Sequence, residues 1–247
     1  YKAEILLKKS LSVKTAISQG VANNFGELKL ASDSVLPHVR TDIVKYLKQG
    51  DGMTVNYLQI DQFLKPAKSI YLKASAGLFE QMFGGIGGEI LYRPFNSDWA
   101  IGAEAWKVKQ RDYDQMFNFL EYETLTGHLN FYYKEPRSQV LIMLKGGRFL
   151  AEDSGIHFDF SRRFKSGMRM GIFFAKTDIS EFEFGEGSFD KGFYFFIPIE
   201  TFFDNYSKGS TGFGLRPLTR DGAAFLKHRN TLYGVTDQGQ SHTISRD

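Results

Sequence analysis

The chain has 247 residues, of which 42% are hydrophobic, and its formal net charge at pH 7 is only +3. This length fits one large β domain or two small ones, and the weak charge, without a basic stripe of stacking aromatics, argues against a nucleic-acid partner. The chain lacks cysteine, which excludes disulfides and thiolate chemistry.

The first predicted elements are a hairpin and one helix. The hairpin covers residues 1–19, where apolar and polar residues alternate on either side of a tight turn. A short strand is expected around Leu28 to Leu30. The helix is predicted over Thr41 to Gln49, with Thr41 as its N-cap and Asp42 in the first turn. Because the chain begins without Met or an apolar leader, we expect a processed protein or part of a longer one.

From residue 54 onward one pattern repeats, with about ten alternating residues followed by turn residues. Ile70 and Leu72 lie on one face and Lys73 and Ser75 on the other, because successive strand side chains point in opposite directions. We expect strands at residues 54–64, 69–79, 83–93, 99–108, 121–133, 139–149, 155–163, 168–177, 191–200 and 209–218. Residues 1–247 are therefore predicted to form a single all-β domain, an antiparallel transmembrane β-barrel of roughly twelve strands with one short helix.

The connections alternate in length, and charge is distributed accordingly. Short turns lie at one end, while the long loops 109–120 and 178–190 lie at the other, as in outer-membrane barrels with brief periplasmic turns. The long-loop end is rich in carboxylates. The short-turn end carries the basic residues Lys65, Lys68, Arg93, Lys134, Arg137, Arg162, Arg163 and Lys165.

Composition and hydropathy also bear on the membrane. The mean hydropathy of -0.29 and the absence of any run of about eighteen apolar residues exclude a transmembrane helix but not a barrel, whose strands need only about 9–11 residues each. Aromatic residues form 15% of the chain, which is typical of barrels with interfacial aromatic girdles. The barrel closes either through a last strand near Asn230 to Val235 or through another segment. The rival fold is a soluble sandwich or lipocalin-like barrel, which would bury Leu129, Phe131 and Phe158 and expose Lys73.

Six segments carry a family resemblance: residues 39–47 (VRTDIVKYL), 84–95 (GGIGGEILYRPF), 109–115 (KQRDYDQ), 126–133 (TGHLNFYY), 184–193 (FGEGSFDKGF) and 215–222 (LRPLTRDG). They resemble the YjbH family, which includes the GfcD-type proteins. That family consists of Gram-negative outer-membrane β-barrel proteins, often lipoproteins, encoded with exopolysaccharide or capsule genes. The resemblance implies a role in polysaccharide assembly or export. Because family members are much longer and begin with a signal sequence, the chain is similar only to their C-terminal portion.

Motifs for catalysis or metal binding are not apparent. The five histidines lack zincin spacing, and the glycines of residues 84–88 precede no Gly-Lys-Ser/Thr, so close packing of a barrel wall is the better interpretation. Carboxylates on a long loop (Glu181, Glu183, Glu186 and Asp190) could supply the pair of a glycosidase or polysaccharide lyase, but such groups are more often solvated or bridge lipopolysaccharide through divalent ions. We expect no catalytic residue, no metal and no cofactor.

The polar strand face provides the candidate contact residues. If the strands pair as simple hairpins, Lys73 lies opposite Glu89, and Lys145 lies opposite Asp159. These charges either neutralise one another in a filled interior or line an aqueous path, and the sequence leaves both open. Near the end of the chain, Arg216, Arg220 and Asp221 either form a strand-end network or contact polymer. The candidate lumen and polysaccharide contacts are Lys73, Glu89, Glu104, His128, Lys145, Asp159, Arg216, Arg220 and Asp221.

Three functional hypotheses follow. The first is a non-enzymatic outer-membrane component of exopolysaccharide or capsule secretion, whose partners are outer-membrane lipid, a polysaccharide and other export proteins. The second is a structural or adaptor barrel that docks on a separate export channel, which a filled interior would favour. The third is a polysaccharide-modifying enzyme, which would require two carboxylates about 5–10 Å apart in an open cleft.

Overall fold

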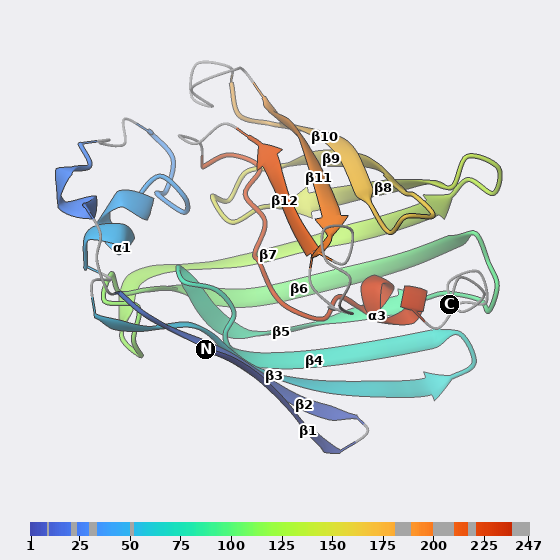
Figure 1. Cartoon of the computed structure of the whole chain (residues 1–247), viewed down its shortest axis with the longest axis horizontal. Coiled ribbons are helices and arrows are strands. Elements are labelled where there is room, and N and C mark those ends of the chain that lie inside the picture. Colours follow the sequence, from blue (N-terminus) through green and yellow to red (C-terminus); the bar gives the residue numbers. More distant parts are fainter. Residues whose placement is uncertain are drawn as a thin grey trace.

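The computed structural model describes residues 1–8, 10–20, 24–29, 34–49, 52–180, 189–199, 210–216 and 221–238. Its main element is one twelve-stranded sheet, in which each strand pairs with its neighbours in sequence (Figure 1). The strands are β1 (Lys2–Lys8), β2 (Leu11–Gln19), β3 (Met53–Ala67), β4 (Ile70–Leu78), β5 (Phe83–Tyr92), β6 (Trp99–Arg111), β7 (Phe119–Lys134), β8 (Val140–Arg148), β9 (Ser154–Arg163), β10 (Arg169–Thr177), β11 (Asp190–Pro198) and β12 (Ser210–Leu215). The helical elements are η1 (Phe25–Glu27), α1 (Ile43–Gln49) and α3 (Leu232–Gln238).

The antiparallel all-β class and the strand number agree with the prediction. Every pairing is antiparallel, from β1 with β2 through β11 with β12. Within the described residues β1 and β12 each have a single strand partner, so the sheet is barrel-like but not closed. The long strands β3–β7 form one side, β8–β12 curve over the other, and residues 221–238 run between the two sides (Figure 1).

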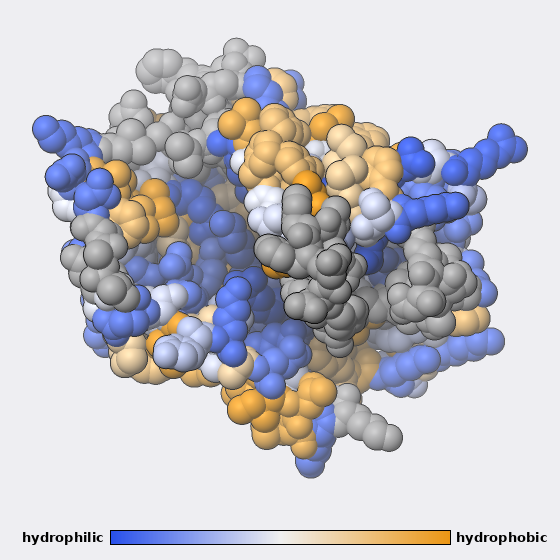
Figure 2. All heavy atoms as spheres, viewed as in Figure 1, coloured by the Kyte–Doolittle hydropathy of each residue, from blue (hydrophilic) through white to orange (hydrophobic). Residues whose placement is uncertain are grey.

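The two faces of the sheet have the opposite polarity to that expected of the sandwich or lipocalin-like rival fold. Leu129 is 72% exposed on the convex face, and Phe131 beside it is also exposed. Lys73 is only 2% exposed and Glu104 only 8%, both on the concave face. Figure 2 shows hydrophilic side chains in the hollow of the molecule and apolar groups toward its rim. The apolar strand residues therefore point outward and the charged ones inward, as the alternation predicts.

Two local predictions at the N-terminal side and one at the C-terminal side need correction. Helix α1 begins at Ile43, and the Thr41 hydroxyl donates to Asp221 Oδ2 at 2.7 Å. Leu28 lies outside any strand, and Leu30 lies outside the described residues. A wall strand at Asn230 to Val235 is absent, because α3 begins at Leu232. Within the described part of the chain, no helix has the length and apolar character needed to cross a membrane.

Glycines in β5 make room for packing on the concave face. A Cβ on Gly87 would lie 2.5 Å from a ring carbon of Trp106, the residue opposite it on β6. Only glycine accommodates the indole at this position, which supports wall packing as the reason for the glycine run. Trp106 belongs to an apolar cluster with Phe79, Leu150 and Tyr46 of α1, so this cluster fastens α1 to one mouth of the sheet.

Candidate functional site

Strand register places four of the candidate residues in one row across the concave face. Lys73 on β4 lies opposite Glu89 on β5, as predicted. Glu89 lies opposite Glu104 on β6, and Glu104 lies opposite His128 on β7. Residues directly opposite in antiparallel strands point to the same face. The alternation therefore brings two carboxylates, an ammonium group and an imidazole together.

Ion pairs with two lysines neutralise the carboxylates of this row. Lys73 Nζ lies 2.5 Å from Glu89 Oε1, and Lys145 Nζ lies 2.8 Å from Glu104 Oε1. His128 Nδ1 is 3.6 Å from the same Glu104 oxygen. Two lysines thus match two glutamates. Buried charges of this kind are tolerable only when they are paired and hydrogen-bonded.

A segment from the C-terminal side of the chain completes the row. His228 Nε2 lies 3.1 Å from Glu104 Oε2, and His228 Nδ1 lies 3.4 Å from Glu89 Oε1. The imidazole also stacks on Trp106, with ring centroids 4.3 Å apart. His228 therefore sits between both carboxylates, and its backbone neighbours lie against the same wall. We call residues 221–238 the inner segment.

The wall holds the inner segment by its backbone. Lys73 Nζ donates to the carbonyl oxygens of Arg229 and Asn230, both at 3.0 Å. The Arg229 amide donates to Gln59 Oε1 at 3.0 Å, and the Leu232 amide donates to Glu89 Oε2 at 2.8 Å. Polar side chains of the sheet thus replace the strand partners that this stretch of backbone would otherwise need.

Aromatic contacts fix the inner segment at two further points. The Phe225 ring lies 4.7 Å from His128 and 4.9 Å from Phe149, measured between centroids. Nearer the other mouth, Tyr233 stacks on Tyr132 at 4.0 Å with an interplanar angle of 9°. The inner segment is therefore packed along its length, and it covers the concave face of the strands from β2 to β9.

Carboxylates at the α1 mouth anchor the start of the inner segment. Asp221 accepts hydrogen bonds from the amides of Arg40 and Thr41 at 2.7 and 3.0 Å. Asp153, in the loop between β8 and β9, accepts one from the Ala223 amide at 2.7 Å. Burial raises the pKa of Asp153 to about 6 even though this hydrogen bond acts in the opposite direction.

The pKa of Asp42, beside α1, is shifted in the opposite direction to that of Asp153. Burial alone would raise its pKa, but hydrogen bonds from Lys45, His38 and Tyr113 hold the pKa of Asp42 below its usual value. Lys45 Nζ lies 3.0 Å from Asp42 Oδ1, so this ion pair joins residues three apart at the start of α1. Asp42 is therefore ionised at neutral pH and ties α1 to the loop that carries Tyr113.

The structure corrects the predicted pairing of Lys145 with Asp159. Lys145 lies opposite His157, and Asp159 lies opposite Met143. The difference of two residues arises because Arg148 pairs with Ser154, so that the loop spans residues 149–153. The Tyr194 hydroxyl donates one bifurcated hydrogen bond to the two carboxylate oxygens of Asp159, each at 3.0 Å, so Asp159 lies apart from the row.

The residues predicted near the C-terminal side do not form one group. Arg216 Nη2 pairs with Asp190 Oδ2 at 2.9 Å, whereas Asp221 holds Arg40 and Thr41. Arg220, Glu181, Glu183 and Glu186 lie outside the described residues, as does Pro217. Asp190, the remaining member of the acidic loop, is fully buried against its arginine partner.

Sequence reasoning missed His228, Trp106 and the rest of the inner segment as parts of this site. His228 carries no local spacing signal, because its partners lie more than a hundred residues earlier in the chain. Glu89, Glu104 and His228 place potential metal-ligand atoms within 4.8 Å of one another. The ammonium groups of Lys73 and Lys145 already occupy both carboxylates, so the cluster favours an ion-pair network over a cation site.

Comparison with known proteins identifies the family. A family model described as "Exopolysaccharide biosynthesis protein YbjH" matches residues 1–238. The chain is 36% identical over 241 residues to the "Uncharacterized lipoprotein YjbH" of Escherichia coli (strain K12). The alignment covers 95% of this chain and 34% of that protein, so the chain spans about a third of the length of its curated relative. No solved structure matches it. The resemblance carried by the six sequence segments is confirmed, and the chain belongs to the YjbH family of exopolysaccharide biosynthesis proteins.

Proposed function

We propose that the chain forms part of the lipid-embedded wall of an outer-membrane protein that takes part in exopolysaccharide or capsule assembly or export. The reversed polarity of its sheet is the observation that carries this proposal. Leu129, Ile86 and Ile172 are exposed on the convex face, while Lys73 and Glu104 are buried. In water this arrangement would be costly on both faces, whereas in lipid each apolar side chain gains about 1.5–3 kcal/mol.

Strand β7 supports a membrane orientation. Its outward residues begin with Phe119, pass through carboxylates, continue with Leu125, Leu129 and Phe131, and end at Tyr133. Tyr133 lies opposite Trp99, whose ring is 5.8 Å from that of Tyr92, so aromatic side chains gather at the short-turn end. An apolar band flanked by aromatic residues is the pattern of an outer-membrane barrel wall.

The filled interior favours a structural or adaptor role for the β2–β9 part of the sheet. Lys73, Glu89, Glu104, His128 and Lys145, which were candidate polymer contacts, instead bind the inner segment and one another. Glu89 and Glu104 also lack the open cleft that glycoside hydrolysis requires. We therefore propose that this part of the sheet is a sealed, non-catalytic wall, and that polymer does not pass along it.

A pair of lysine substitutions on the outward face of β7 tests membrane insertion. Leu129→Lys places a charge at the middle of the apolar band, where the cost is about 2–4 kcal/mol. Glu121→Lys changes charge on the same face of the same strand, close to the long-loop end, where the expected cost is about 0–1 kcal/mol. The full-length protein refolded into lipid vesicles provides both unfolding free energies. Equal costs at the two positions would contradict a lipid-facing surface.

A further inference from the structure

The concave face of β9–β12 contains an open pocket. The pocket has a volume of about 410 Å³, and its lining includes Arg169, Phe173, Tyr194, Phe196 and Arg216. The inner segment contacts His157 on β9 through Phe225, and its Ala223 shares an apolar cluster with Ala175 at the long-loop end of β10. Among the described residues, the inner segment thus fills one part of the concave face, and a pocket lies in the next part.

The accessible charges of this pocket are cationic. Asp159 is buried and accepts a bifurcated hydrogen bond from the Tyr194 hydroxyl, and Asp190 is buried against Arg216. The Arg216 side chain is nevertheless 41% exposed, and Arg169 is exposed as well. Because the carboxylates are enclosed and the guanidinium groups are open, a ligand entering the pocket meets positive charge first.

A second arginine faces Arg169 directly. Arg163 on β9 lies opposite Arg169 on β10, so both side chains point to the concave face. Like charges in this relation are destabilising, and within the described residues neither guanidinium lies in an ion pair with a carboxylate. Among the described residues, Arg169 Nη2 donates two long hydrogen bonds, to Ser161 and Tyr194, at 3.4 and 3.3 Å, and its guanidinium lies 5.6 Å from the centroid of the Tyr194 ring. An anion between the two arginines would relieve their repulsion and use donors of both guanidinium groups.

Phe196 supplies an exposed aromatic face beside this anion site. It is 42% exposed, and its ring lies 5.9 Å from that of Tyr194 at an interplanar angle of 47°. A Cβ on Gly212 would come within 2.7 Å of Phe196 Cδ1, so the glycine on β12 leaves space for that ring. Aromatic faces of this kind pack against the C–H face of a sugar ring, and a few placed polar groups then fix its orientation.

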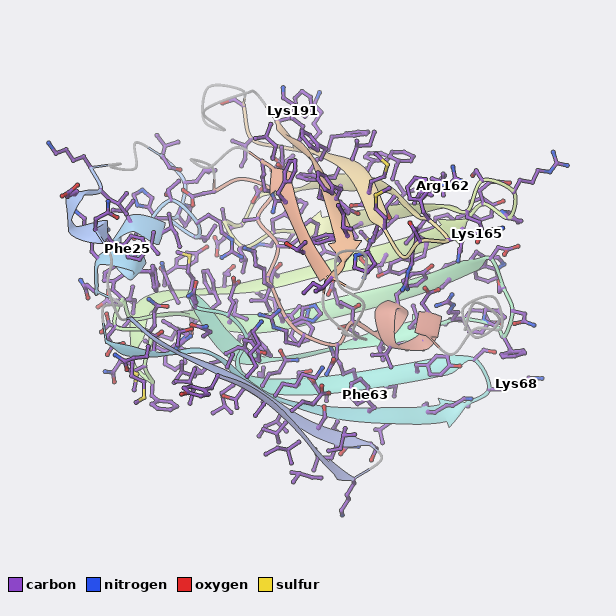
Figure 3. All side chains as sticks on the ribbon, viewed as in Figure 1. Phe25, Phe63, Lys68, Arg162, Lys165 and Lys191 are labelled. Atoms are coloured by element: carbon purple, nitrogen blue, oxygen red, sulfur yellow. The ribbon has the colours of Figure 1, made fainter. Side chains whose placement is uncertain are left out.

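We infer that this pocket binds an acidic sugar unit of a polysaccharide, such as a hexuronate residue. The sugar carboxylate lies against Arg169, which lines the pocket, on the side where Arg163 faces it from β9, and the sugar ring lies over Phe196. The choice of a saccharide rests on the proposed role in exopolysaccharide assembly, whereas the requirement for an anion rests on the arginine geometry alone. The site lies near the short-turn end, where Figure 3 also shows Arg162, Lys165 and Lys68.

Calorimetric titration of the full-length protein in detergent tests the inference. The probes are an oligomer of β-1,4-linked glucuronate and a neutral β-1,4-glucose oligomer of the same length. We expect the acidic oligomer to bind more tightly than the neutral one. Arg169→Gln should weaken its binding at least roughly tenfold, because a charge-assisted hydrogen-bonded pair is lost. Phe196→Ala should weaken binding of both oligomers.

Arg162→Gln provides the matched control. Arg162 lies opposite Met170 and points to the convex face, so its loss should leave binding unchanged. No binding of the acidic oligomer, equal binding of the two oligomers, or equal losses in Arg169→Gln and Arg162→Gln would overturn the inference. Equally tight binding of inorganic phosphate would overturn the saccharide assignment. Heat-modifiable electrophoretic mobility of each preparation reports barrel assembly separately, so a failed membrane wall is distinguished from a failed sugar site.

Discussion

Charged side chains that point to the concave face have different partners in its two parts. In the β2–β9 part, inward charges are paired with one another and with the backbone of the inner segment. In the β9–β12 part, Arg163 and Arg169 face each other, and their strands border a pocket. An identical alternation of polar and apolar residues therefore produces a sealed wall in one place and an open cationic pocket in another. The difference lies in what covers the polar face.

Removing Lys73 should give the largest effect on the filled part. Lys73→Met leaves Glu89 buried without its ammonium partner and removes the donor to two carbonyls of the inner segment. Breaking a buried pair in this way costs about 3–5 kcal/mol in the free energy of unfolding. Urea unfolding in lipid vesicles measures it.

The control for Lys73→Met is Lys107→Met on the convex side. The Lys107 side chain is largely exposed, and its ion pair with Glu123 spans 3.9 Å. An exposed pair contributes only about 0–1 kcal/mol. If the two substitutions cost the same, the inner segment is not held as described.

The attachment of the inner segment should depend on pH through Asp153. Its pKa is about 6 in the folded protein, compared with 3.8 for the free group, so the folded state binds the additional proton between these values. Stability is then greatest below pH about 4 and declines as the pH rises through about 6, by on the order of 3 kcal/mol at most. Above pH about 6 this contribution is constant.

Asp153→Asn separates this effect from other titrating groups. The asparagine oxygen still accepts from the Ala223 amide but does not titrate between pH 4 and 7. The difference in melting temperature between the original protein and the variant should therefore change across pH 4–6 and remain constant above it. A difference that is the same at every pH would refute the assigned role of Asp153.

Substitution in the open part should have the smallest effect on stability, and of the opposite sign. Arg163→Gln removes one of two facing guanidinium groups, so we expect the free energy of unfolding to rise by about 0.2–1 kcal/mol. Arg169→Gln relieves the same repulsion but also removes the hydrogen bonds of Arg169 to Ser161 and Tyr194, so its gain should be smaller. A loss of more than about 1 kcal/mol in both variants would mean that the arginines stabilise the fold, as the filled part does.

Much of the sheet could be predicted from the sequence because the alternation of side chains along a strand is a local property. The opposition of Lys73 and Glu89 follows from a short loop with one simple register. The predicted pairing of Lys145 with Asp159 was wrong because the loop before Ser154 begins and ends one residue earlier than expected. Lys145 is therefore opposite His157, two residues before Asp159. Hairpin register therefore depends on the hydrogen bonds of the loop, such as that from the Phe149 amide to the Asp153 carbonyl at 2.8 Å.

Only the strand residues of the candidate site could be predicted from the sequence. The wall residues Glu104 and His128 were identified because their polar type interrupts apolar strands at regular spacing. His228 and Asn230 could not be identified, since the segment that carries them has neither strand alternation nor a helical period before α3. Their positions depend on hydrogen bonds to Glu104 and Asp61, which lie far away in the chain.

The sequence by itself determined the class of the protein, its strands and which face of each strand is apolar, because the side chains of a strand alternate with a period of two whatever lies around them. Only the tertiary structure decided that the inner segment fills the β2–β9 part while a pocket remains in the β9–β12 part. That outcome depends on long-range pairing of buried charges with peptide groups, such as Lys73 with the carbonyl oxygen of Asn230, and no local pattern encodes it.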